Sequence, residues 1–196
     1  MYLSAIDISP VRPASSWLKS YYFTRFAFSA AWVTAAFTVA NDNRFLAAFL
    51  LIAYPAWDAA ANYADASHSG GLSDNMSQTL NLTFSTMTAI AVAAALGLGM
   101  HLVVGIFGIW AIFAGLFQLT AAVHRWKSAR AQWPMILSGV QSMLAGVFMI
   151  TIAVGAKPVG ITDIAPYAAF GAFYFLVSGI SLAISDARRG AVGSSV

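Results

Sequence analysis

The sequence contains no cysteine and no glutamate, and charged side chains make up only 9% of its 196 residues. The lack of cysteine excludes disulfides, thiolate chemistry and cysteine-ligated metals. A soluble domain usually carries about 25% charged residues, so this chain has too little charge for a water-soluble fold. The net charge is only +3, and the basic residues do not gather into one patch. Nucleic acid is therefore not an expected partner.

Hydrophobic residues, by contrast, make up 60% of the chain and fall into long stretches. The hydrocarbon core of a bilayer is about 30 Å thick and requires about 20 apolar residues per helix. We therefore predict an all-α integral membrane protein with six transmembrane helices. The expected spans are 20–40, 44–65, 77–99, 101–123, 133–156 and 163–184. They form a transmembrane domain over 20–184, with an N-terminal segment at 1–19 and a tail at 185–196.

The basic residues predict how these helices are oriented. Arg44 and Lys157 lie on one side of a six-span arrangement, and the other eight lysines and arginines lie on the opposite side. Basic residues gather on the cytoplasmic side of a membrane protein. Both termini are therefore expected in the cytoplasm. The eight residues are Arg12, Lys19, Arg25, Arg125, Lys127, Arg130, Arg188 and Arg189.

The second, fourth and sixth spans share a short pattern in which an aromatic residue is followed by small residues. It begins at Tyr54, at Trp110 and at Tyr174. Repetition of this kind predicts three related helical hairpins. Small residues one turn apart would let helix backbones approach closely. Such pairs are Ala111 with Gly115, Ser142 with Gly146, and Gly179 with Ala183.

Two stretches carry a family resemblance, namely residues 108–116 (Gly-Ile-Trp-Ala-Ile-Phe-Ala-Gly-Leu) and 133–139 (Trp-Pro-Met-Ile-Leu-Ser-Gly). Together with the repeat, they resemble the HdeD-like family of small bacterial inner-membrane proteins. The resemblance implies six spans built from short hydrophobic repeats, a multi-pass protein of the bacterial inner membrane, and an association with acid resistance. It brings no established catalytic residues.

Asp58 is the residue that departs most from this apolar background. A carboxylate at a helix centre costs roughly 2.5–3.5 kcal/mol on insertion scales, so it must be paired, hydrated, protonated or functional. The repeat has Ala114 and Ser178 at the equivalent positions. Arg25 lies at a similar depth on the neighbouring first span, so we predict an Arg25–Asp58 ion pair. Amides at similar depth extend this pair into a candidate polar cluster of Arg25, Asp58, Asn62, Asn81, Gln118 and Gln141.

No pattern in the sequence calls for a metal or another cofactor. His68, His101 and His124 lie in different connections, and no histidine–aspartate pair has metal-ligand spacing along a helix. Gly97 and Gly99 are expected to end a helix rather than to bind phosphate. We therefore expect neither a metal site nor a catalytic constellation.

Three functions remain open. The favoured one is a noncatalytic membrane protein, stress-related or accessory, that acts through membrane lipids, a membrane-protein partner or a second copy of itself. The second is a small proton- or ion-coupled transporter that uses Asp58, which requires a water-accessible path to this residue from at least one side. The third is a membrane-embedded enzyme on a hydrophobic substrate, with Asp58 as general acid. That enzyme requires a closed aromatic pocket holding Asp58 without Arg25.

Overall fold

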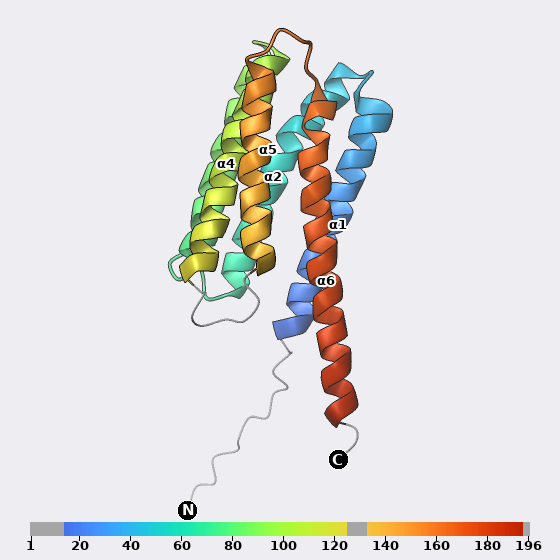
Figure 1. Ribbon diagram of the computed structural model, residues 1–196, viewed down its shortest axis with the longest axis vertical. Coiled ribbons are helices and arrows are strands. Elements are labelled where there is room, and N and C mark those ends of the chain that lie inside the picture. Colours follow the sequence, from blue (N-terminus) through green and yellow to red (C-terminus); the bar gives the residue numbers. More distant parts are fainter. Residues whose placement is uncertain (1–13, 125–132, 194–196) are drawn as a thin grey trace, which may run out of the picture.

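The computed structural model describes residues 14–124 and 133–193, and this part of the chain is helical throughout apart from its connections (Figure 1). Arg12, Arg125, Lys127 and Arg130, whose positions contributed to the predicted orientation, lie outside the described residues. The elements are α1 (Ala14–Ala35), the π-helical turn η1 (Ala36–Ala40), α2 (Arg44–His68), α3 (Met76–Ala95), α4 (Met100–His124), α5 (Trp133–Ala153), the 3-10 turn η2 (Ile161–Asp163) and α6 (Ala165–Gly193).

The helix boundaries follow from local backbone chemistry. Asn43 caps α2, because its side-chain oxygen accepts hydrogen bonds from the backbone N–H groups of Phe45 and Leu46, each at 3.1 Å. The predicted break between the third and fourth spans is present, since α3 ends at Ala95 and α4 begins at Met100. Gly99 has a φ of 130° at this break, a conformation that favours glycine.

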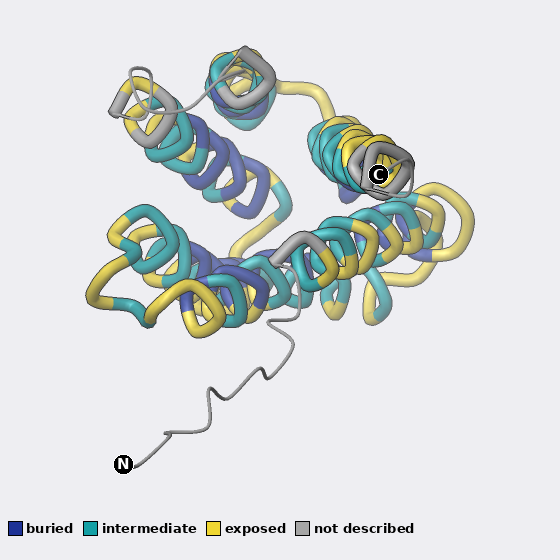
Figure 2. The backbone as a smooth tube through the Cα atoms, turned by 90° about the horizontal axis from the view of Figure 1, so that it is seen from below, coloured by how far each residue is buried: buried dark blue, intermediate teal, exposed yellow. Residues whose placement is uncertain are grey.

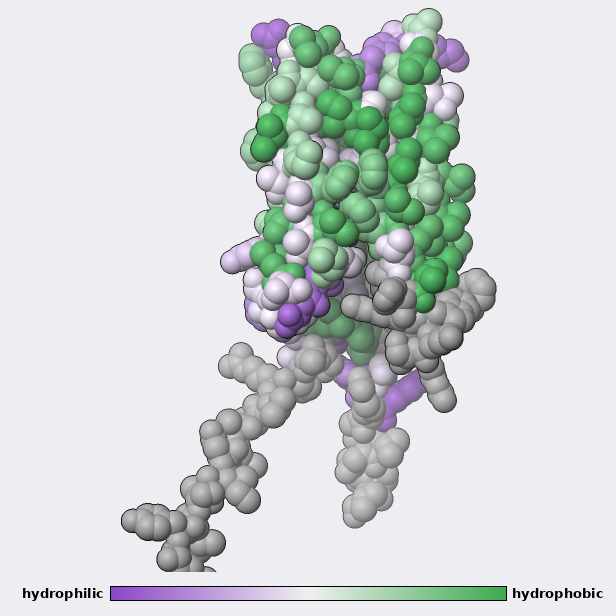
Figure 3. All heavy atoms as spheres, turned by 90° about the vertical axis from the view of Figure 1, so that its left-hand side faces the viewer, coloured by the Kyte–Doolittle hydropathy of each residue, from purple (hydrophilic) through white to green (hydrophobic). Residues whose placement is uncertain are grey.

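Five of the helices in the described chain are long and apolar enough to cross a membrane. The exception is α3, whose first three turns carry serine, threonine, glutamine and asparagine side chains. In Figure 3 the side of the molecule is mostly hydrophobic, and hydrophilic residues gather toward its two ends. The five candidate spans are Ser16–Ala40, Arg44–His68, Met100–Thr120, Ile136–Ala153 and Ala165–Arg188.

Viewed along the bundle, the six helices form a ring in which close and loose contacts alternate (Figure 2). The close pairs are α1 with α6, α2 with α3, and α4 with α5. The pairs α1 with α2 and α5 with α6 touch only sparsely. The predicted arrangement as three hairpins is therefore not confirmed, because the most extensive contacts lie between the expected hairpins rather than within them.

The contact between α4 and α5 is the closest in the ring because glycines face one another across it. A Cβ added to Gly108 would lie 2.8 Å from the carbonyl oxygen of Gly146, and one added to Gly115 would collide with the carbonyl of Gly139. Of these four glycines, Gly115 and Gly146 belong to small-residue pairs expected from the sequence. Backbones that approach this closely pack by dispersion, which is the main attraction between helices in lipid.

The two halves of the bundle are filled differently. The terminal half is the half next to the first residue of α1 and the last residue of α6, which lie at the same end (Figure 1). The far half contains the apolar core, which includes Trp32, Leu51, Phe107, Met149 and Ile164, each no more than 2% exposed. Large side chains from α1, α2, α4, α5 and the connection before α6 thus close the far half.

Candidate functional site

The terminal half encloses a cavity of about 600 Å³ that is lined by residues from all six helices. This volume lies within the 300–1,000 Å³ that is typical of small-molecule sites. On α1 the cavity extends from Leu18 to Ser29, which at 1.5 Å per residue is roughly 16 Å along the helix. It reaches Ser77 in the first turn of α3, at the terminal end of the bundle. The cavity therefore runs from that end to the lower edge of the apolar core.

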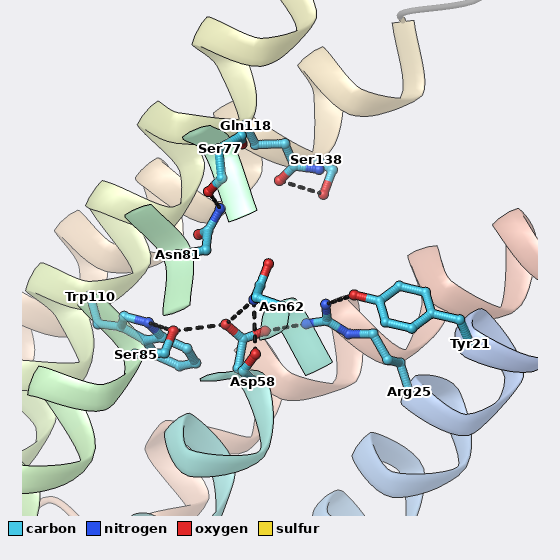
Figure 4. A network of polar contacts seen from close by, with 10 residues as sticks. All are labelled: Tyr21, Arg25, Asp58, Asn62, Ser77, Asn81, Ser85, Trp110, Gln118 and Ser138. Atoms are coloured by element: carbon cyan, nitrogen blue, oxygen red, sulfur yellow. Dashed lines mark hydrogen bonds and ion pairs between the residues drawn. The ribbon is translucent and has the colours of Figure 1, made fainter. Parts of the chain in front are cut away.

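Asp58 lies in the wall of this cavity, and hydrogen-bond donors occupy both of its carboxylate oxygens (Figure 4). Arg25 Nη2 donates to Oδ1 and forms the ion pair expected from the sequence. Asn62 and Ser85 donate to Oδ2 at 3.0 and 2.8 Å. The carboxylate thus has a counter-charge and two neutral donors, which lowers the cost of holding a charge in an apolar helix.

Arg25 is fixed from three sides. Its Nη1 donates to the Tyr21 hydroxyl at 2.8 Å, and its guanidinium lies 4.2 Å from the centre of the Phe175 ring. The side chains of Arg25 and Asp58 are only 13% and 16% exposed. Cation–π contact and the carboxylate together hold this arginine in one position within the membrane domain.

The other predicted amides also line the cavity but form separate hydrogen bonds. Asn81 donates to the backbone of Ser77 at 2.9 Å, and Gln118 accepts from Ser138 at 3.4 Å. In Figure 4 these bonds lie apart from the Asp58 network. Gln141 accepts a hydrogen bond from the Tyr174 hydroxyl at 2.8 Å. All six residues of the predicted cluster thus border one space, whereas only Arg25, Asp58 and Asn62 bond directly to one another; their action as a site remains a prediction.

The cavity also explains the repeat found in the sequence. The aromatic repeat positions Tyr54, Trp110 and Tyr174 all line it. So do the residues four positions later, which are Asp58, Ala114 and Ser178. The three even-numbered helices therefore turn the same face toward the cavity, and only α2 places a charge there.

Ser85, Trp110 and Phe175 extend this network but were not part of the predicted cluster. Ser85 bonds to the carboxylate and accepts a hydrogen bond from Trp110 Nε1 at 3.0 Å. Phe175 covers the guanidinium of Arg25. Ser85 lies 27 positions from Asp58, so only the close packing of α3 on α2 brings it there. A buried serine on a helix face carries no sequence signal that separates it from the other small residues of these spans.

Metal ligands are not gathered at this site. Within residues 14–124 and 133–193, no group of three or more His, Asp or Glu side chains is placed to hold a metal ion. His68 stacks on Trp17 with ring centres 3.5 Å apart, and His101 lies 3.0 Å from the backbone oxygen of Lys157. These two histidines therefore make separate structural contacts.

Residues 84–151, about a third of the chain, match the protein family described as a short repeat of unknown function (DUF308). This repeat is the family domain of HdeD-like proteins, so the resemblance found in the sequence is confirmed over this segment. The matched segment runs from α3 through α4 into α5 and includes the glycine contact between the last two. No curated protein and no solved structure matches the chain.

Proposed function

We propose that this chain is a noncatalytic multi-pass protein of the bacterial inner membrane that binds a small molecule in the cavity around Asp58. The observation that carries the proposal is the cavity itself, which has about 600 Å³ and polar lining from all six helices. Helix packing alone does not require such a space, because membrane helices can fill their contacts with apolar or small residues, as α4 and α5 do.

The surroundings of Asp58 favour binding over catalysis. An enzyme with Asp58 as general acid needs this carboxyl without a cationic partner, yet Arg25 pairs with it in the same wall. Both carboxylate oxygens of Asp58 already accept hydrogen bonds, from Arg25, Asn62 and Ser85, so neither is placed to pass a proton to a substrate. Asp58 instead holds Arg25 and Asn62 in fixed positions around the cavity.

Transport is the second candidate, and one observation favours it. The cavity reaches Asp58 from the terminal end and stops at the apolar core of the far half. A carrier that alternates between two open states has this form in one of them. Proteoliposomes loaded with a radiolabelled probe that binds the cavity would then release this probe faster than protein-free liposomes loaded with the same probe. Release at the control rate would leave binding as the function.

The proposed orientation places both ends of the chain in the cytoplasm. Lys19 and Arg188 belong to the helix ends at the terminal end of the bundle, whereas Arg44 begins α2 at the far end. The excess of basic residues on one side supports a cytoplasmic terminal end. The association of HdeD-like proteins with acid resistance supports a stress-related setting for the binding.

A thermal-shift experiment tests the proposal with the purified protein and three neutral probes: glycerol, glucose and a dodecyl glucoside. A bound probe at 100 times its Kd stabilises the protein by about 2.7 kcal/mol. Ala114→Trp fills the cavity, and Ile109→Trp is a matched control on the same helix, since Ile109 is 51% exposed. We expect at least one probe to stabilise the native and control proteins but not Ala114→Trp. If no probe acts, or if all three proteins respond equally, the proposal fails.

A further inference from the structure

The lining of the cavity is electrically neutral as a whole. Arg25 and Asp58 are its only charged residues among those that the structure describes, and they neutralise one another. An anion or cation entering this space would leave its water without meeting an unpaired opposite charge, which is costly in a low-dielectric site. The cavity is therefore suited to a ligand without net charge.

The hydrogen-bonding groups of the lining point to a particular head group. Buried donors without a partner are found on Arg25 (Nε), Trp57 (Nε1) and Gln141 (Nε2), and Gln78 carries a buried acceptor without a partner. All four residues line the cavity. A hydroxyl group both donates and accepts hydrogen bonds, whereas an amine mainly donates them and an ester only accepts them. Small local movements would let a head group with several hydroxyls satisfy both kinds of group.

The cavity also has a side that faces the membrane. Helices α5 and α6 touch only sparsely, and both contribute lining residues. Phe170 and Val177 on α6 line the cavity and are 52% and 40% exposed. The Tyr174–Gln141 hydrogen bond crosses between the two helices at 2.8 Å. The space between α5 and α6 thus has apolar side chains beside a polar interior, and side-chain hydrogen bonds of Tyr174 with Gln141 and of Tyr167 with Ser142 bridge it.

We propose that the ligand is an uncharged amphiphile with a hydroxyl-rich head and an alkyl tail, which enters from the membrane between α5 and α6. The head lies beside the Arg25–Asp58 pair and the side-chain amide nitrogen of Gln141, which has no hydrogen-bond partner. The tail leaves past Phe170 and Val177 into lipid. This inference rests on the proposed function, because it names the ligand class of the same cavity.

Photolabelling in phosphatidylcholine vesicles tests the inference. The probe is a dodecyl glucoside with a diazirine in its chain, and the comparison probes carry the same chain on a phosphate or a trimethylammonium head. We expect the glucoside to label the Phe170–Val177 stretch of α6 most strongly. Ser142→Trp, which fills the cavity from α5, should lower this labelling roughly tenfold, because an overfilled cavity excludes its ligand. The matched control is Leu144→Trp, because Leu144 is 65% exposed on the same helix, and its labelling should stay unchanged.

Each outcome separates the inference from the proposed function. Equal labelling by all three probes, or labelling that survives in a folded Ser142→Trp, shows ordinary lipid contact and overturns the inference. If free glucose stabilises the protein and competes with the glucoside at equal strength, the ligand is water-soluble; the inference fails and the proposed function stands. If binding of glycerol, glucose and every amphiphile is independent of the cavity, both fail. Should Ser142→Trp not fold, Ala145→Phe replaces it at the next lining position on α5.

Discussion

The far half and the terminal half of this bundle are built from the same helices, but the far half is packed and the terminal half is hollow. In the far half, Trp32, Phe107 and Met149 pack with almost no exposed surface. In the terminal half the same helices surround a cavity of about 600 Å³ that is lined by polar as well as apolar side chains. The change occurs within about two turns of α4, from Phe107, which is fully buried in the core, to Ala114, which lines the cavity. A large side chain therefore fills the bundle at one level, and a small one leaves room for a ligand at the next.

This contrast supports placing the proposed binding function in the terminal half. Tight packing needs no charge, and the far half has none among its core residues. The ion pair and the amides all lie in the terminal half, where they border the cavity. Polar groups are retained in a membrane helix at a cost, so their position around the cavity supports the proposal that the terminal half binds the ligand.

Removing volume from the far half should have the largest effect. Phe107 is fully buried in the core, so Phe107→Ala leaves a cavity that its neighbours cannot fill. We expect the free energy of unfolding to fall by about 3–5 kcal/mol. Unfolding in a denaturing detergent titration measures the change. A loss below about 1 kcal/mol would mean that the far half is not the packed region described above.

Breaking the ion pair should have the next largest effect. Arg25→Gln leaves the Asp58 carboxylate without its counter-charge, and loss of one partner of a buried pair costs about 3–5 kcal/mol. Because both side chains are slightly exposed, we expect a value near the lower end of that range. The double variant Arg25→Gln/Asp58→Asn should recover most of the loss in the same titration. If the loss caused by Arg25→Gln and the loss caused by Asp58→Asn alone simply add in the double variant, the side chains do not act as a pair.

Adding volume should separate the two halves through a smaller effect. Ala111→Leu inserts a side chain into packed surroundings and should cost about 1–3 kcal/mol. Ala114→Leu makes the same change about one turn later but points into the cavity, so we expect a change below about 1 kcal/mol. Equal losses in the titration would remove the distinction between the halves.

Much of this fold is visible in the sequence because its determinants are local. The length of each apolar run and the glycines at 97 and 99 predicted the helices and the break between α3 and α4. The Arg25–Asp58 pair could be predicted because a short connection places α1 and α2 at neighbouring depths. Depth along a helix is readable from residue spacing alone.

The pairing of helices and the cavity could not be predicted in this way. Close packing of α2 on α3 and of α1 on α6 depends on how side chains of two helices fit together, which the residue spacing within one helix does not give. Ser85 joins Asp58 only through that packing. The amides at 81, 118 and 141 were predicted to share one polar cluster; all three line the cavity, but each forms its hydrogen bond with a different partner. Sequence spacing gives their depth and not the distance across the bundle.

Water access at a packed position and at a cavity position of α4 tests the central claim most directly. The chain has no cysteine, so single variants report without background. Ala114→Cys and Ala111→Cys, reconstituted in vesicles, would be treated with a membrane-impermeant, water-soluble thiol reagent, and the fraction labelled would be measured by mass. The hollow terminal half predicts fast labelling at position 114 and none at 111. Equal labelling at the two positions, or none at 114, would contradict the account.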